Sequence, residues 1–472
     1  MQLTPQQNQA LQQLQAFVQQ PGGRAFVLRG YAGTGKTTLV GRLVEWLDGA
    51  DYRPVLLATT GRAAKVLQDK TGWTAHTVHS CIYAFQEVGG SEGAWTGEAA
   101  GQLQLDFKLR RNYGAPGKLV YIVDEASMIS HEAAGGEHTA KFGSGSLLDD
   151  FLAYASGHKV VFVGDPCQLP PIGQNPYSAA LDEGFLRQRY ALAAEAFELR
   201  EIVRQRAGSE ILAIAGRFRD RAVSQEYEKY PKVKVPKGGS AHLYPSEEGL
   251  LAAYVQQARR GGFGSAAMLC HANWQCSRLN GAIRQALGRQ GPLQPGELLM
   301  VVQNSYDVSL ANGDQVVLEQ AAFDCRRAGL EFYNVAVRAL HNNERYETKL
   351  IANLLHDDSA GLSPEQTRRL IIDFDQRVRH PGLGRNSEAY KQAMMADPYL
   401  NALRVKYGYA ITCHKAQGGE WEHVFLNIFK SIYGMKRPEL YRWYYTALTR
   451  AQHHLHLNDG WWVEGFDWRK GG

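Results

Sequence analysis

Short apolar runs alternate with helical stretches through the first part of the chain. The runs lack polar alternation, which is typical of parallel strands buried on both faces of a sheet. They occupy residues 25–28, 54–58, 120–123 and 159–163. This βαβ order predicts a parallel sheet with helices on both faces. The same rhythm returns at residues 265–287 and 407–457, so we expect a second α/β domain that is split by an insertion.

Two segments interrupt this rhythm. Residues 103–109 alternate between apolar and polar side chains after a glycine-rich stretch, which predicts one arm of a β-hairpin inserted in the first domain. Further along, an Asn-Gly turn between strand-like runs precedes a helix, which predicts a small β domain with a helical arm. The predicted limits are 1–84 with 118–198 for the first domain, 85–117 for the hairpin, 199–305 with 404–472 for the second domain, and 306–403 for its insertion.

The composition narrows the class of protein only slightly. The chain has 472 residues, 44% hydrophobic and 21% charged, which is enough for about three domains with cores of their own. Its net charge of +5 favours a polyanionic partner without identifying one. The six cysteines are scattered without zinc spacing, and the N-terminus lacks the order of a signal peptide. We therefore expect a soluble cytoplasmic protein with reduced thiols and no membrane partner.

A phosphate-binding loop is predicted directly after the first apolar run. Residues 30–37 read Gly-Tyr-Ala-Gly-Thr-Gly-Lys-Thr and fit the pattern GxxxxGK[ST] between a strand and a helix. Glycines let backbone N–H groups surround a phosphate, and the helix N-terminus adds a positive dipole. Lys36 can then reach the β- and γ-phosphates, while the Thr37 hydroxyl can ligate Mg²⁺. A glycine-rich turn without function is the alternative, which the strand–loop–helix order disfavours.

Two acids follow the third apolar run. Asp124 can hold the Mg²⁺ water shell, and Glu125 can orient or deprotonate the attacking water. Buried strands often end in acids without any catalytic role, so this pair is informative only together with the phosphate loop.

Three polar side chains outside these motifs are candidates for sensing the γ-phosphate. Gln168 follows the next apolar run, at the sheet edge where α/β proteins bind ligands. Arg204 and Arg450 lie beyond the first domain and could act as arginine fingers across a domain cleft. The alternatives are a proline-stiffened turn for Gln168 and an ordinary surface ion pair for either arginine.

These motifs, in this order, resemble superfamily-1 helicases of the RecD/Dda branch, which translocate 5′→3′ on single-stranded DNA. The most specific matches are Gly-Asp-Pro-Cys-Gln-Leu-Pro-Pro at residues 164–171 and Thr-Cys-His-Lys-Ala-Gln-Gly at 412–418. The resemblance spans nearly the whole chain and implies two RecA-like domains in tandem. It also implies that the hairpin is a pin and that the second insertion is SH3-like.

The resemblance assigns roles to individual residues. Those implied in ATP binding are Gln7, Gly33, Thr34, Gly35, Lys36, Thr37, Thr38 and Glu420, with Mg²⁺ held by Thr37 and Asp124. Those implied in catalysis are Lys36, Glu125, Gln168, Arg204 and Arg450. Those implied in DNA binding are Thr60, Arg62, Thr77, His79, Phe107, Thr412, His414 and Lys415, with Thr60 where the family usually has proline.

Several of these residues have simpler explanations. Gln7 also completes a helix capping box with Thr4, which requires no ATP. His79 and His414 could be core histidines. Phe107 either stacks on a base at the fork or packs under the hairpin, because it shares one face with its leucine neighbours. Packing is also expected for Trp274, Trp421 and Trp443, and solvent exposure for the helix face with Arg368, Arg369, Arg377 and Arg379.

The predicted activity is ATP hydrolysis between two domains that DNA crosses, by a monomeric motor on single-stranded and forked DNA. Single-strand-binding, replication or repair proteins are candidate partners. Three alternatives remain: a translocase that strips proteins without separating strands, an RNA helicase of the same superfamily, and a binding module with a decayed ATPase site.

Overall fold

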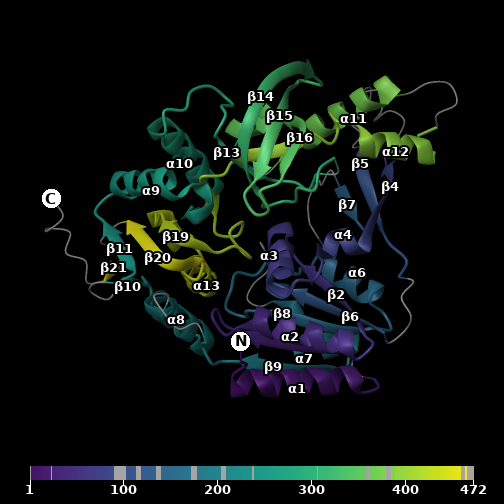
Figure 1. The fold of residues 1–472 in the computed structure, drawn as a ribbon, viewed down its shortest axis with the longest axis vertical. Helices are drawn as coiled ribbons and strands as arrows, with labels where there is room; N and C mark the ends of the chain where they lie inside the picture. Colours follow the sequence, from purple (N-terminus) through teal and green to yellow (C-terminus); the bar gives the residue numbers. More distant parts are fainter. Residues whose placement is uncertain are drawn as a thin grey trace.

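Two parallel sheets lie side by side in the computed structural model, and a closed barrel lies beside both (Figure 1). The structure describes residues 2–22, 24–89, 103–112, 118–133, 140–171, 178–203, 209–235, 239–305, 307–357, 359, 361–378, 384–385, 387–458 and 463–464. Arg204 and Arg379 lie outside these ranges, as does most of the glycine-rich stretch before β5.

The first sheet contains the four strands predicted from the apolar runs. Its order is β3-β2-β6-β8-β1-β9, and all neighbours are parallel. The strands are β1 Ala25–Gly30, β2 Arg53–Ala58, β3 Ala75–Thr77, β6 Leu119–Asp124, β8 Lys159–Gly164 and β9 Ala194–Leu199. Because successive side chains point to opposite faces, every one of these strands except β3 contributes to two separate hydrophobic cores.

Helices cover both faces of this sheet, as predicted. One face packs against α1 Pro5–Gln19, α2 Lys36–Gly49 and α3 Gly61–Thr71. The other packs against α4 Val78–Ile82, α6 Leu147–Tyr154 and α7 Glu183–Tyr190. The start of α1 follows from its sequence, since Thr4 and Gln7 form the expected capping box and a proline occupies the first turn.

The second sheet has the order β11-β20-β19-β12-β18, also with parallel neighbours throughout. Its strands are β11 Ala241–Tyr244, β12 Ala266–Cys270, β18 Ala410–Thr412, β19 Trp421–Leu426 and β20 Ala451–Asn458. Helices α9 Glu247–Gly261 and α10 Asn273–Ala286 pack on one face, and α8 Ser209–Ser224 and α13 Arg437–Leu448 on the other. Two further strands, β10 Val233–Lys234 and β21 Val463–Glu464, form a small pair beside this sheet.

A closed five-stranded barrel interrupts the second sheet domain. Its strands are β13 Leu298–Val301, β14 Gln315–Arg327, β15 Leu330–Ala339, β16 Arg345–Ile351 and β17 Leu403–Tyr407. The boundary drawn at residues 306–403 divides this barrel, because β13 lies before it and β17 extends past it. A short apolar run looks the same whether it enters a barrel or a parallel sheet, so periodicity could not place this boundary.

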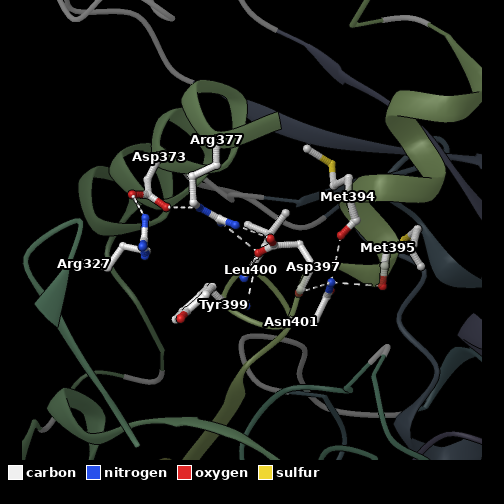
Figure 2. A network of polar contacts seen from close by, with 9 residues as sticks. All are labelled: Arg327, Asp373, Arg377, Met394, Met395, Asp397, Tyr399, Leu400 and Asn401. Atoms are coloured by element: carbon white, nitrogen blue, oxygen red, sulfur yellow. Dashed lines mark hydrogen bonds and ion pairs between the residues drawn. The ribbon is translucent and has the colours of Figure 1, made fainter. Parts of the chain in front are cut away.

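The helical arm of the barrel consists of α11 Pro364–Val378 and α12 Glu388–Ala396. Figure 2 shows how Arg377 joins its parts: the guanidinium pairs with Asp373 on its own helix at 2.8 Å and with both carboxylate oxygens of Asp397. Asp373 also pairs with Arg327 of β14 at 3.0 Å. Arg368 and Arg369 pair with Glu365. Arg369 is exposed, as expected for a solvated helix face, whereas Arg377 is half-buried and joins the parts of the arm.

The predicted hairpin is present as two arms of a three-stranded sheet. Strand β4 Tyr83–Gly89 pairs antiparallel with β5 Gln104–Leu109, and β7 Ala140–Phe142 adds to β5 in parallel. The apolar side chains of the hairpin share a core with α11 and α12, so this part of the first domain docks on the arm of the second (Figure 1).

The prediction that Phe107 stacks on a base at the fork is not met in this structure. Its side chain is only 7% exposed, its ring stacks on Phe142 at 4.6 Å, and it meets Phe85 edge-on at 5.6 Å. A ring covered on these sides cannot also stack on a base, so the packing interpretation holds in this structure.

The three tryptophans expected to pack differ from one another. Trp421 and Trp443 are buried, whereas Trp274 is 44% exposed and meets Phe429 edge-on. In the described ranges, 3₁₀ turns lie at Ala126–Met128, Ala179–Leu181, Phe263–Ser265, Ala352–His356 and Lys430–Gly434. Across the ranges that the structure describes, no helix combines the length and the apolar character needed to cross a bilayer.

Candidate nucleotide and strand site

The phosphate loop lies at the carboxyl edge of the first sheet, between β1 and α2. Gly33 and Gly35 adopt left-handed backbone angles, with φ of +82° and +77°, which L side chains rarely adopt. A methyl group on Gly35 would also lie 2.4 Å from the Gln7 amide nitrogen. Glycine is therefore required here both for the turn and for the close approach of α1.

The lysine and the two threonine hydroxyls of the motif are in the first turn of α2. The Lys36 ammonium donates to the carbonyls of Gly30 at 2.7 Å and Tyr31 at 3.2 Å, so it lies across the loop. Thr37 and Thr38 follow it at the helix N-terminus, where orphan N–H groups and the helix dipole favour an anion.

Helix α1 fixes the other side of the loop. The Gln7 amide donates to the Thr34 carbonyl at 2.9 Å, and its oxygen accepts from the Thr4 N–H at 3.0 Å. Gln7 therefore caps its own helix and contacts the phosphate loop at once. Gln6, which sequence reasoning did not single out, accepts from the backbone N–H groups of residues 200 and 201. The N–H of Val203 in turn donates to the Gly33 carbonyl at 2.9 Å.

The two acids after β6 lie beside the loop. The Asp124 carboxylate accepts from the Glu125 N–H at 2.8 Å, and Glu125 has a positive φ of 50°. Such a backbone angle in a non-glycine residue is costly and is often found at functional sites. Burial raises the pKa of Asp124. Burial and the neighbouring Asp124 raise the pKa of Glu125 to about 7, which poises it as a base near neutral pH.

A tyrosine from the second domain reaches the same edge. The Tyr445 hydroxyl donates to Asp165 at 2.6 Å and accepts from the Ala32 N–H of the phosphate loop at 2.8 Å. Burial and the Asp165 carboxylate raise the pKa of Tyr445. Sequence reasoning quoted this tyrosine only as part of the motif that ends in Arg450. Nothing in the local sequence pattern indicated a polar link to the loop.

The segment after β8 connects both domains. The Leu169 carbonyl accepts from the Gln417 amide at 2.8 Å, and the Leu169 N–H donates to the Thr446 hydroxyl at 3.0 Å. Gln168 is buried beside them, and its side-chain oxygen has no hydrogen-bond partner among the residues that the structure describes. A buried, unsatisfied amide at this edge is consistent with a ligand-sensing role.

Arg450 is buried and held from three sides. Its guanidinium donates to the carbonyls of Thr446 at 3.0 Å and Gly419 at 3.1 Å, and to the Thr449 hydroxyl at 3.2 Å. Its positive charge lowers the pKa of Glu125, in opposition to the effect of burial. Glu420 instead accepts from Gln452 of β20 at 3.2 Å.

The candidates for strand contact in the first domain already have partners within the protein. The hydroxyls of Thr60 and Thr77 cap α3 and α4 by accepting from the N–H groups three residues later. His79 packs edge-on to Phe142, and burial lowers its pKa. Arg62 reaches into the second domain, where its guanidinium lies 4.1 Å from the Trp421 ring centroid.

Two candidates of the second domain, Thr412 and Lys415, line a cavity of about 120 Å³ together with Lys406. Burial and the charge of Lys406 lower the pKa of Lys415 to about 8. Burial and the nearby His271 lower the pKa of His414 to about 4, so His414 is neutral at physiological pH. Lys415 is thus a partly desolvated cation, which an anion would stabilise.

The fold and the phosphate loop define a P-loop protein with two RecA-like sheet domains in tandem. A family model described as an AAA domain matches residues 2–234, and one described as a UvrD-like helicase C-terminal domain matches residues 407–458. A solved structure from work on DNA unwinding at forked dsDNA by two coordinating Pif1 helicases has the same fold. Its TM-score is 0.51 at 16% identity, covering 97% of this chain and 92% of that one.

The resemblance to superfamily-1 helicases is confirmed by these matches and by two relatives, which support a RecD/Pif1-like type. The ATP-dependent RecD2 DNA helicase of Deinococcus radiodurans is 25% identical over 451 residues, which are 93% of this chain and 48% of the relative. The probable conjugal transfer protein TraA of Sinorhizobium fredii is 31% identical over 143 residues, which are 30% of this chain and 10% of the relative. The chain thus spans about half the length of the RecD2 helicase that it matches.

Proposed function

We propose that this protein is an ATP-dependent DNA helicase that moves 5′→3′ on single-stranded DNA and hydrolyses ATP between its two sheet domains. One observation carries the proposal: the charges of Lys36 in the first domain and Arg450 in the second both act on the buried Glu125, where Tyr445 of the second domain also bonds to the phosphate loop. A decayed ATPase site would not preserve this arrangement.

The oxygen donors beside the loop fit a hard divalent cation. Thr37 offers a hydroxyl and Asp124 a buried carboxylate whose raised pKa reflects poorly compensated charge. Mg²⁺ held by these two side chains would neutralise charge on the β- and γ-phosphates. Lys36 binds the same phosphates, Glu125 orients or deprotonates the attacking water, and Arg450 stabilises charge in the transition state. Arg204 is proposed for a similar role from the resemblance alone.

Hydrolysis can be transmitted through the contacts that join the two domains. Tyr445 connects the phosphate loop with Asp165, and Leu169 is bonded to both Gln417 and Thr446. Each of these hydrogen bonds joins a residue of the first domain to one of the second. A change at the γ-phosphate would therefore shift one domain relative to the other. Such a domain movement is the step that translocation requires.

The strand is proposed to bind the second domain at Thr412 and Lys415, with Thr60, Thr77 and His79 of the first domain along the same path. Phosphate contacts and stacking would dominate, so sequence preference should be low and salt dependence steep. We propose that the hairpin sheet is the pin and that the barrel, taken from β13 to β17, is the SH3-like insertion. Protein partners, such as single-strand-binding, replication or repair proteins, would act on a monomeric motor.

A translocase that moves without separating strands is the second candidate, because Phe107 is buried and offers no wedge. The test is ATPase activity with and without single-stranded DNA, followed by unwinding of duplexes that carry one tail at a time. We expect strong stimulation by DNA, weaker stimulation by RNA, and unwinding only with a 5′ tail.

The possible results separate the candidates. Translocation without unwinding of the 5′-tailed duplex supports the second candidate, and equal unwinding of a 3′-tailed duplex refutes the polarity. Preferential stimulation by RNA identifies an RNA helicase. An ATPase indifferent to nucleic acid and salt refutes both proposals.

A further inference from the structure

Arg62 lies at the start of α3 in the first domain, yet its side chain contacts the second. Its guanidinium is stacked over the Trp421 ring at 4.1 Å, and one of its nitrogens donates to the Gln315 amide oxygen at 3.1 Å. Burial, together with the like charge of Arg450, lowers the pKa of Arg62 to about 10, while Asp314 opposes that change. A desolvated guanidinium with these contacts is poorly placed to bind a strand in this structure.

The segment that Arg62 contacts is the one that holds Arg450. The Arg450 guanidinium donates to the Gly419 carbonyl at 3.1 Å, and the Trp421 N–H donates to the Arg450 carbonyl at 3.0 Å. A methyl group built on Gly419 would lie 2.7 Å from the Arg62 side-chain nitrogen. Arg62 therefore packs directly against the residue whose carbonyl orients Arg450.

This contact forms only where the two domains meet. Neighbouring contacts join the same surfaces: Lys65 of α3 pairs with the buried Asp314 at 2.7 Å, and the start of α3 lies against Ala311. The two guanidinium groups repel one another, and stacking on Trp421 and the bond to Gln315 offset that repulsion. Opening of the cleft would remove Arg62 from this segment and leave Arg450 with less support.

We propose that Arg62 is a positioning residue for Arg450: its guanidinium fixes the Gly419–Trp421 segment across the domain interface, so that Arg450 points at the attacked phosphate only when the cleft is closed. This role rests on the proposed function and replaces the strand contact that the resemblance implies for Arg62. It makes closure of the cleft a condition for catalysis.

The test compares Arg62→Ala and Arg62→Lys with Lys65→Gln in the full chain, after thermal melts confirm folding. We expect both Arg62 variants to lower kcat for ssDNA-stimulated ATP hydrolysis by about 10- to 100-fold, the cost of slight misplacement of a catalytic group. Lysine should not rescue activity, because it keeps the charge but lacks the planar stacking surface. KM for ATP and affinity for a fluorescent oligonucleotide should change little. Lys65→Gln crosses the same interface without touching Gly419 and should retain kcat.

A double-mutant cycle makes the test specific. Adding Arg62→Ala to Arg450→Ala should lower kcat no further, because the positioned group is already gone. An additional loss of the same size would show independent roles and overturn the inference. So would weaker DNA binding with normal kcat at saturating DNA, or an equal loss in Lys65→Gln. A wild-type protein without ATPase activity rejects the proposed function itself, whereas an active wild type with unchanged Arg62 variants rejects only this inference.

Discussion

The carboxyl edges of the two sheets are built in different ways. At the edge of the first sheet, Lys36 and Asp124 are held by near neighbours in sequence, Gly30 and Glu125. The edge of the second sheet contributes side chains that cross to the first, as Gln417 does to Leu169. We therefore expect the first edge to bind a nucleotide by itself and the second to act only when the domains meet.

This difference predicts separate effects on ATP binding and on the rate of ATP hydrolysis. Substitutions at the first edge should remove nucleotide handling altogether. Substitutions at the second should leave ATP binding intact and lower the rate at which bound ATP reacts, because interactions made in the transition state raise kcat.

The largest effect is expected for Lys36→Ala. This change removes the ammonium that lies across the phosphate loop, so ATP hydrolysis should be abolished while the fold and much of the ssDNA affinity persist. Steady-state ATPase, circular dichroism and oligonucleotide binding measure these three properties. Near-normal hydrolysis would show that the loop is not the phosphate site.

Arg450→Ala should lower kcat by about 10³-fold and leave KM for ATP near the wild-type value, because an arginine finger acts mainly in the transition state. Initial rates over a range of ATP concentrations give both parameters. If KM alone rises, Arg450 contributes to ATP binding rather than to catalysis. The contrast between the carboxyl edges of the two sheets would then be wrong.

Tyr445→Phe removes the single hydroxyl that joins the phosphate loop to Asp165 and fills the same volume otherwise. We expect kcat to fall about tenfold, equivalent to a hydrogen bond worth roughly 1.4 kcal/mol. Tyr441→Phe is the matched control, because its hydroxyl accepts from the Glu228 N–H within the second domain. Equal losses in both variants would indicate general destabilisation rather than coupling of the edges.

The smallest effect expected is that of Glu125→Gln on stability, whereas its effect on the hydrolysis rate should be large because Glu125 is the proposed base. The pKa of Glu125 is raised to about 7 in the folded protein, so ionisation costs stability as pH rises from its ordinary value of 4.5 through 7. Glutamine carries no such cost. Without nucleotide, the Tm of the variant should exceed that of wild type increasingly up to about pH 7, by roughly 2–4 °C per kcal/mol. A difference that is constant with pH would contradict the burial of this charge.

Local patterns explain what the sequence could predict. The four apolar runs, the capping box and the phosphate loop each depend on residues within one turn or one strand–helix unit, and all are present. The role of Phe107 depends on β7, which follows β5 only after the whole of β6 and pairs with it. This pairing brings Phe142 onto the Phe107 ring. Alternation placed Phe107 on an apolar face but could not show what covers that face.

Side chains that cross between domains were the least predictable. Tyr445 and Arg62 sit in recognisable motifs, yet their partners are the phosphate loop and the Trp421 segment, far away in sequence. Nothing in a local pattern distinguishes an arginine that binds a strand from one that stacks on a tryptophan. The barrel boundary failed for the same reason, since pairing of β13 with β17 is a long-range property.

The strand order also sets the sequence of events during synthesis. Every strand of the first sheet has left the ribosome once residue 199 has emerged, whereas β12 must wait for β18 and β19, beyond the whole barrel, and β11 waits for β20. Nascent domains generally fold as units from the N-terminus. The first domain should therefore be folded while strands β11 and β12 are still unpaired and exposed, so chaperone binding and aggregation during translation should concentrate on the second.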